Sequence, residues 1–254
     1  MSTNTEVPRR EFLRVAVGAG VMAAAAAQGA ASRLATRSVM QLRAPPLERV
    51  RIGLVGLGSR GMGALPRLLT IEGVEITALC DVEPDRVAAA QQQLEKKERP
   101  KAREYTGAED AWHGLCGDAH VDVVYNCTPW RLHTPISVRA MLEGKHALVE
   151  VPAAVTLEEC WQLVETAEAT QRHCMMLENC CYGATELMVL RMCREGLLGE
   201  LIHGEGAYIH DLRAAKMNGY HRFWRLRESV KRNGNLYPTH GLGPIAQVLN
   251  INCG

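Results

Sequence analysis

Residues 51–81 read RIGLVGLGSRGMGALPRLLTIEGVEITALCD, and this stretch decides the fold. An apolar run leads into the glycine turn Gly56–Gly61. A second apolar run ends on Asp81, 20 residues after the last glycine. Strand, GxGxxG turn, helix, strand and acid in this order are typical of a unit that binds a dinucleotide. The stretch therefore predicts a Rossmann-type fold with a nicotinamide cofactor.

The glycines of the turn have separate tasks. Gly56 permits the tight turn, Gly58 lets the backbone approach the pyrophosphate, and Gly61 lets the helix pack close to the strand. The N–H groups at the start of the helix attract phosphate. Asp81 can accept hydrogen bonds from both ribose hydroxyls and would repel a 2′-phosphate, which favours NAD over NADP. The alternative is a glycine-rich turn in another α/β protein, which leaves the position of Asp81 unexplained.

The N-terminus is predicted to be an export signal. Residues 8–14 read PRREFLR, and a mild apolar run, Val15–Ala27, and small residues to Ser32 follow. This pattern resembles a twin-arginine signal over residues 1–32, with a linker over 33–47, and the run is too short for a stable membrane span. The alternative is a basic tail or an N-terminal anchor. We expect export by the twin-arginine machinery and a periplasmic or secreted protein.

Export of this kind constrains the chemistry. Twin-arginine export carries folded proteins, often with the cofactor in place, and free NAD is not expected outside the cytoplasm. An exported NAD protein should hold its cofactor tightly and restore its redox state in each turnover. This argues against a dehydrogenase that consumes soluble NAD.

The composition is that of an ordinary globular protein. The formal net charge is +1 and 47% of the residues are hydrophobic, so nothing indicates a nucleic-acid partner. The nine cysteines form no CxxC pair, and an odd number predicts no disulfide framework.

Strands and helices alternate over residues 48–178, which predicts an α/β fold with a doubly wound parallel sheet. The expected strands are 50–55, 74–80, 105–106, 121–127, 147–149 and 174–177. Residues 179–254 are expected to begin an α+β substrate domain, with a helix at 187–193, an alternating strand at 202–210 and a helix after Gly243-Pro244. Because only about 75 residues follow the first domain, we expect a fragment or a truncated substrate domain.

Ligands of such sheets bind beyond the carboxyl ends of the strands. Four segments should converge there: the glycine turn, Thr128–His133, Glu150–Pro152 and Glu178–Asn179. The alternatives for the last three are a loop with a buried tryptophan and an N-terminal histidine, a solvent-exposed glutamate, and a turn-forming asparagine.

The segments GLGSRG (56–61), CDVEPDR (80–86), TPWRLH (128–133) and GKHALVEVP (144–152) resemble the Gfo/Idh/MocA oxidoreductase superfamily. Most oxidoreductases of that superfamily have a lysine where this chain has Val151. That lysine assists proton transfer at the alcohol, and valine cannot do so. The ordinary sugar-dehydrogenase mechanism is therefore in doubt.

Four further segments resemble glycoside hydrolase family 109, whose members are NAD-dependent α-N-acetylgalactosaminidases. They are residues 150–170, MMLENCCYG (175–183), GEGAYIHDLR (204–213) and NGNLYPTHGLGP (233–244), so that the resemblance covers about 48–252. The family has a larger C-terminal domain, and the chain stops partway into it.

The resemblance implies two sets of site residues. With the glycine turn, the NAD contacts are Ser59, Arg60, Asp81, Trp130, Arg131, Leu132, His133, Glu150, Val151 and Asn179. The sugar contacts are Tyr208, Arg225, Tyr237, Pro238, Thr239 and His240. Tyr237 and His240 are the best acid/base candidates, although which takes which proton stays open. The alternative is a loop whose tyrosine packs and whose histidine caps the next helix. The histidines show no metal-ligand spacing, and no metal is expected.

The implied reaction is redox-neutral. Oxidation at C3 of the sugar makes the C2 proton acidic, a base removes it, and the glycosidic oxygen leaves from C1. Water then adds and the hydride returns, which is the NAD-dependent exception to two-carboxylate glycosidases. The alternatives are an exported NAD-dependent sugar or polyol oxidoreductase, and an inactive cofactor-binding fragment. A truncated substrate domain would expose apolar surface, so a homo-oligomer is possible.

Overall fold

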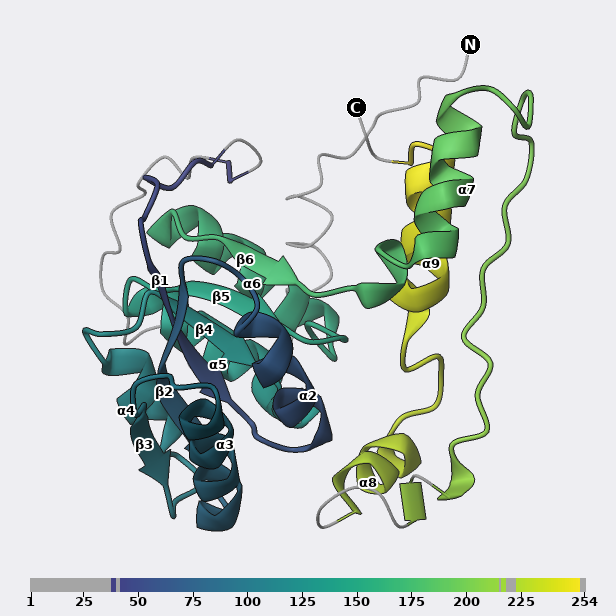
Figure 1. The fold of residues 1–254 in the computed structure, drawn as a ribbon. Helices are drawn as coiled ribbons and strands as arrows, with labels where there is room; N and C mark the ends of the chain where they lie inside the picture. The colour runs from purple at the N-terminus through teal and green to yellow at the C-terminus, as the bar shows by residue number, and fades with distance from the viewer. Residues whose placement is uncertain (1–37, 40–41, 215, 218–222, 252–254) are drawn as a thin grey trace, which may run out of the picture. The chain divides into compact units, whose positions relative to one another are not determined.

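Six parallel strands form one sheet in the order β3-β2-β1-β4-β5-β6, seen in the computed structural model (Figure 1). The strands are β1 (Val50–Val55), β2 (Val74–Asp81), β3 (Arg103–Thr106), β4 (Val123–Asn126), β5 (His146–Val149) and β6 (Cys174–Met176). The strand order reverses between β1 and β4, which pair directly. This is the strand order of the dinucleotide-binding Rossmann fold, and it confirms the predicted fold class.

Helices cover both faces of the sheet. They are α2 (Ser59–Leu68), α3 (Pro84–Lys96), α4 (Trp112–Gly117), α5 (His133–Leu142) and α6 (Leu157–Thr170). Because side chains alternate along β1, Ile52 and Leu54 pack with α2 and α3 on one face, whereas Val55 packs with α4 and α5 on the other. Thr156 caps α6, since its hydroxyl accepts a hydrogen bond from the Glu159 amide at 3.2 Å.

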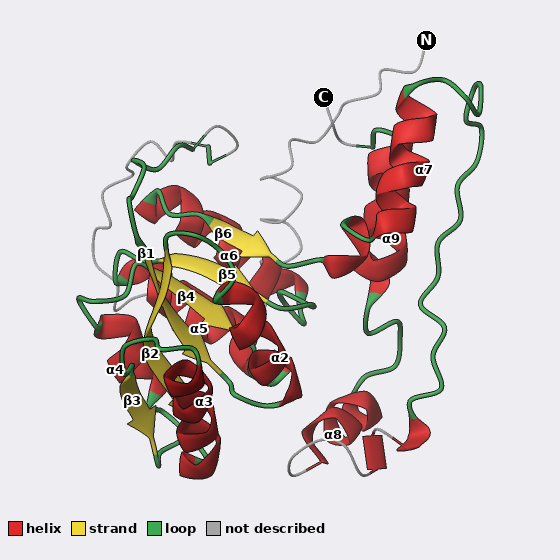
Figure 2. Cartoon of the chain, viewed as in Figure 1, coloured by secondary structure: helices red, strands yellow, loops and turns green. Residues whose placement is uncertain are grey.

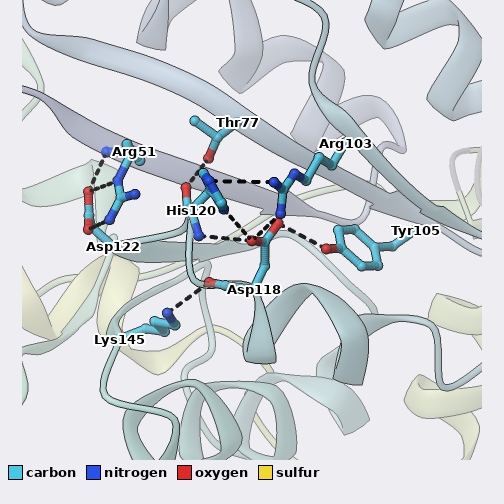
Figure 3. A network of polar contacts seen from close by, with 8 residues as sticks. All are labelled: Arg51, Thr77, Arg103, Tyr105, Asp118, His120, Asp122 and Lys145. Carbon is cyan, nitrogen blue, oxygen red and sulfur yellow. Dashed lines mark hydrogen bonds and ion pairs between the residues drawn. The ribbon is translucent and has the colours of Figure 1, made fainter.

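A polar network lies at the amino ends of the strands, opposite the ligand edge (Figure 3). Asp118 is buried, and its carboxylate accepts hydrogen bonds from the Arg103 guanidinium at 2.7 Å and the Tyr105 hydroxyl at 2.9 Å. Nearby, the Arg51 guanidinium donates twice to the Asp122 carboxylate, at 2.6 and 2.9 Å. These ion pairs tie β1 and β3 to the segment between α4 and β4, at the end of the sheet that does not face the ligand.

The part after β6 is helical and extended in the described residues. It contains η3 (Asn179–Cys181), a short 3₁₀ helix, and then α7 (Ala184–Arg194), α8 (Trp224–Lys231) and α9 (Pro238–Val248). The strand predicted at 202–210 is wrong, because residues 201–212 form neither helix nor strand (Figure 2). Ile202 and Ile209 are 91% and 89% exposed, and no described strand pairs with this segment. Helix α9 begins at Pro238, five residues before Gly243, and α8 was not predicted.

The structure describes residues 38–39, 42–214, 216–217 and 223–251. The predicted twin-arginine signal, residues 1–32, lies outside them, as does part of the predicted linker. Within the described residues, no helix combines the length and apolar character needed to cross a membrane.

Candidate active site

The glycine turn leaves room for a ligand at the start of α2. Gly56 has φ +89°, and a Cβ there would lie 2.7 Å from the backbone of Cys127. A Cβ on Gly61 would collide with the Gly56 carbonyl oxygen, so both positions require glycine. Among the described residues, the atom nearest to a Cβ built on Gly58 is an Arg86 guanidinium nitrogen at 3.8 Å, and no side chain caps α2. This open cradle at a helix N-terminus fits a pyrophosphate.

Asp81 lies at the end of β2, beside the turn. Its carboxylate accepts hydrogen bonds from the backbone amides of Leu57 at 2.7 Å and Glu83 at 3.0 Å. Each carboxylate oxygen has a second lone pair, so the group can still accept from two ribose hydroxyls. Arg86 lies 3.6 Å from the same carboxylate and was not predicted from the sequence. The residues present thus fit an adenosine ribose without a 2′-phosphate.

Glu150 connects three elements at the carboxyl ends of the strands. It is buried, and it accepts hydrogen bonds from the Tyr125 hydroxyl and the Arg60 guanidinium, both at 2.8 Å. Arg60 also donates to the Asn179 amide oxygen at 3.0 Å. Burial raises the pKa of Tyr125, and the charges of Cys127 and Glu150 add to the effect. Tyr125 therefore stays protonated and keeps donating to Glu150.

The loop after β4 has a mainly structural role. His133 is 1% exposed, and its two ring nitrogens contact the carbonyl oxygens of Pro152 at 2.6 Å and Thr128 at 2.8 Å. Burial lowers the pKa of His133, while the two carbonyls act in the opposite direction. Its side chain holds the loop in place instead of offering a free nitrogen to a ligand. Leu132 packs against the core, and Arg131 is exposed to solvent.

Trp130 lies in an aromatic cluster with Tyr237. Its indole N–H donates to the Tyr237 hydroxyl at 3.2 Å, and the two rings meet edge to face. Arg225 is buried, and its guanidinium lies 4.9 Å from the centre of the Tyr237 ring. Val151 packs in the same cluster. The predicted cofactor residues Trp130 and Val151 thus meet the predicted sugar residues Tyr237 and Arg225.

An open pocket of about 370 Å³ adjoins this cluster, and its lining includes Tyr208, Arg225 and Tyr237. Tyr208 packs against Tyr237 and His240, with ring centres 5.1 and 5.2 Å apart. Aromatic faces beside polar groups suit the apolar and hydroxylated sides of a small polar ligand.

Glu178 is the centre of the polar part of the site. It is buried, and it accepts hydrogen bonds from the Thr239 hydroxyl at 2.6 Å, from His240 Nδ1 at 2.6 Å and from the Cys180 amide at 3.0 Å. Pro238 is the first residue of α9 and places Thr239 and His240 on its first turn. Because Nδ1 of His240 faces a carboxylate, the neutral tautomer that fits this contact has its proton on Nδ1 and a lone pair on Nε2.

The structure brings most of the predicted site residues together. Around the glycine turn lie Ser59, Arg60, Asp81, Glu150 and Asn179, and around Tyr237 lie Trp130, Val151, Tyr208, Arg225, Thr239 and His240. The sequence predicts that the Glu178–Asn179 segment lies at the ligand edge but indicates no role for Glu178. The available signal was an acidic residue directly after a strand. Tyr125, inside β4, gave no such signal.

The fold and the site define a dinucleotide-binding protein of the oxidoreductase type. Residues 50–178 match the model of the oxidoreductase family with the NAD-binding Rossmann fold, and residues 182–254 match the C-terminal domain of glycosyl hydrolase 109. The chain belongs to the Gfo/Idh/MocA oxidoreductase family, in its glycosyl hydrolase 109 branch.

Two curated relatives are named α-N-acetylgalactosaminidase. The relative from Bacteroides fragilis is 49% identical over 221 residues, which are 85% of this chain and 52% of that protein. The relative from Shewanella oneidensis is 47% identical over 258 residues, which are 98% of this chain and 56% of that protein. The chain thus spans about half the length of the curated relatives it matches.

Two solved structures show the same fold. An NAD-binding oxidoreductase from Klebsiella pneumoniae is 22% identical with a TM-score of 0.64 and covers 80% of this chain and 54% of its own. An aldose-aldose oxidoreductase from Caulobacter crescentus, complexed with glycerol, is 21% identical with a TM-score of 0.60 and covers 80% and 58%.

Proposed function

We propose that the chain is an NAD-dependent glycosidase that hydrolyses terminal α-N-acetylgalactosamine or a related hexosaminide. The observation that carries the proposal is the cluster of Glu178, His240 and Tyr237, whose neighbour Asn179 accepts a hydrogen bond from Arg60 at the start of α2. The names of the two α-N-acetylgalactosaminidase relatives support the choice of sugar. Val151 supports a reaction mechanism without the lysine of ordinary sugar dehydrogenases, since its side chain has no titratable group.

Bound NAD would supply reversible acceptance of a hydride from C3 of the sugar, with no net oxidation. Two of the chain's own residues can then move protons. His240 Nε2 has a lone pair, because Glu178 engages Nδ1, and can act as a base. The Tyr237 hydroxyl accepts from the Trp130 N–H and can donate its own proton.

Arg225 and the aromatic rings would position the sugar. Stacking of Tyr237 on His240, with ring centres 4.9 Å apart and nearly parallel planes, fixes both rings. The Arg225 guanidinium, 4.9 Å from the centre of the Tyr237 ring, also restricts the ring and could donate to sugar oxygens. Glu150 and Asn179 would hold Arg60 beside the cradle.

The test is release of nitrophenol from nitrophenyl α-N-acetylgalactosaminide, recorded together with nicotinamide absorbance. The proposal expects release without net NADH, and the Bacteroides fragilis relative serves as positive control. Steady NADH formation on a free sugar would favour a sugar oxidoreductase instead. NAD bound with neither activity would favour a cofactor-binding fragment.

We also propose that the twin-arginine machinery exports the protein, on the support of the PRREFLR segment at residues 8–14. A fusion to a reporter that is active only after folded export should reach the periplasm, and replacing Arg9 and Arg10 by lysine should retain it in the cytoplasm.

Self-association is a further proposal, supported by exposed apolar side chains such as Ile202, Leu197 and Met188. Light scattering after gel filtration would measure it.

A further inference from the structure

We propose that Glu178, Cys180 and His240 form a binding site for Zn²⁺ and that zinc inhibits the protein there. The carboxylate, the thiol and the imidazole each offer a ligand atom, and these three atoms lie within 4.8 Å of one another. The sequence did not indicate this site, because His240 is 62 residues from Glu178 along the chain.

The donor set suits zinc. Tetrahedral zinc sites combine sulfur, nitrogen and oxygen ligands at about 2.0–2.3 Å, which puts the ligand atoms about 3.3–3.8 Å apart. Shifts of about 1 Å would bring the three atoms to this spacing, and a water molecule could take the fourth position. Thiolate and carboxylate together carry two negative charges, which balance the ion in a half-buried place. Mg²⁺ and Ca²⁺ prefer oxygen ligands, so they should not bind.

Packing holds the ligand-bearing segments together before any ion arrives. Glu178 and Cys180 are two residues apart around η3, and His240 lies on the first turn of α9. A Cβ on Gly243 of α9 would lie 2.7 Å from the Cys181 sulfur, so only glycine lets α9 approach η3 this closely. The Cys180 amide already donates to Glu178, which orients the carboxylate.

Proton movements explain the inhibition. When zinc binds to the form with a neutral His240 ring, the Cys180 thiol proton leaves to solvent, and the imidazole proton transfers from Nδ1 to Nε2. No electrons move, and one proton is released per ion. His240 Nε2 then carries a proton and has no lone pair for base catalysis. The inhibition rests on the proposed glycosidase function, whereas zinc binding does not.

The test titrates metal-free protein with Zn²⁺ by calorimetry and records the visible spectrum with Co²⁺ in its place. We expect one ion per chain, one proton released, and the intense cobalt bands of a tetrahedral site with a thiolate. Cys180→Ser and His240→Gln should lose stoichiometric binding, whereas Cys160→Ser, at an exposed thiol on α6, should retain it. Thermal unfolding of each variant shows whether it is folded.

The outcomes separate this proposal from the glycosidase proposal. If the protein cleaves no glycoside but binds zinc, and only Cys180→Ser and His240→Gln lose zinc binding, the metal site is supported and the glycosidase is overturned. An active glycosidase that binds no zinc, or whose zinc binding survives Cys180→Ser, would overturn the metal site alone. An active enzyme inhibited by zinc and restored by a chelator would support both.

Discussion

The carboxylate of Glu178 accepts a 2.6 Å hydrogen bond from Nδ1 of His240, and this pair joins the end of β6 to the first turn of α9. Among the described residues, three donors converge on Glu178: the His240 ring, the Thr239 hydroxyl and the Cys180 amide. A carboxylate has only acceptors and satisfies all three, whereas a glutamine amide cannot. The pair therefore directs Nδ1 of His240 toward Glu178 and leaves Nε2 outside the pair.

Glu178→Gln should lower kcat by about 100-fold, because His240 loses its fixed tautomer and at least one buried donor loses its partner. NAD binding should change little, since Glu178 does not line the glycine turn. Steady-state kinetics and NAD titration measure the two effects. An unchanged kcat would show that His240 acts without Glu178.

Trp130→Phe should lower kcat by about 3- to 10-fold, as expected for the loss of one neutral hydrogen bond worth about 1 kcal/mol. The phenyl ring keeps most of the contacts in the aromatic cluster but cannot donate to the Tyr237 hydroxyl. Trp112→Phe, on α4, is the matched control and should leave kcat unchanged. Equal kinetics of the two variants would mean that the Tyr237 hydroxyl needs no donor.

Asp81→Ala should shift cofactor preference from NAD toward NADP by about 10-fold or more. The substitution removes the charge that repels a 2′-phosphate and leaves Arg86, now 3.6 Å from Asp81, to pair with it. The double variant with Arg86→Ala should lose the gain in NADP affinity but not the loss in NAD affinity. Fluorescence titration with both reduced cofactors checks this, and an unaltered preference would contradict the role of Asp81.

Asp118→Ala should lower the free energy of unfolding by about 2–3 kcal/mol, because it removes a buried charged acceptor from Arg103, Tyr105 and the His120 amide. Cofactor affinity should stay the same, since this network lies at the opposite edge of the sheet. Glu195→Ala breaks an exposed pair with Arg191 and should cost less than about 0.5 kcal/mol. Urea unfolding compares them, and equal losses would contradict the account.

Stability should fall as the pH drops below about 6.5, the pKa of an unfolded histidine. Burial, followed by the charges of His173 and Arg172, lowers the pKa of His146 in the folded protein. The unfolded chain therefore takes up a proton first, and stability is lost from that pH down to the lower folded pKa, below which the loss stays constant.

His146→Asn should reduce this acid-side loss, because an amide oxygen can still accept from the His173 backbone N–H but does not titrate. Melting temperatures between about pH 7 and pH 5.5 measure the slope. His113→Asn, at an exposed ring on α4, should keep the slope of the parent. Parallel curves for the parent and His146→Asn would show that His146 does not contribute.

The sequence predicts the sheet well because its signals are local. The run Ile52–Val55, the glycine turn and Asp81 follow one another in the chain, and each strand end marks the ligand edge. Contacts such as Glu178–His240 and Trp130–Tyr237 join residues 62 and 107 positions apart, and no local pattern encodes them. The alternation at 202–210 led to a wrong strand prediction for a related reason. A strand also needs a pairing partner, which alternation alone does not provide.

A glycosidase of the proposed kind oxidises and re-reduces its own substrate. Cleavage of a nitrophenyl α-N-acetylgalactosaminide in deuterium oxide, with mass and proton NMR spectra of the released sugar, tests it most directly. The account predicts one deuterium at C2 and no net change in nicotinamide absorbance. Sugar released with its original C2 hydrogen would contradict it.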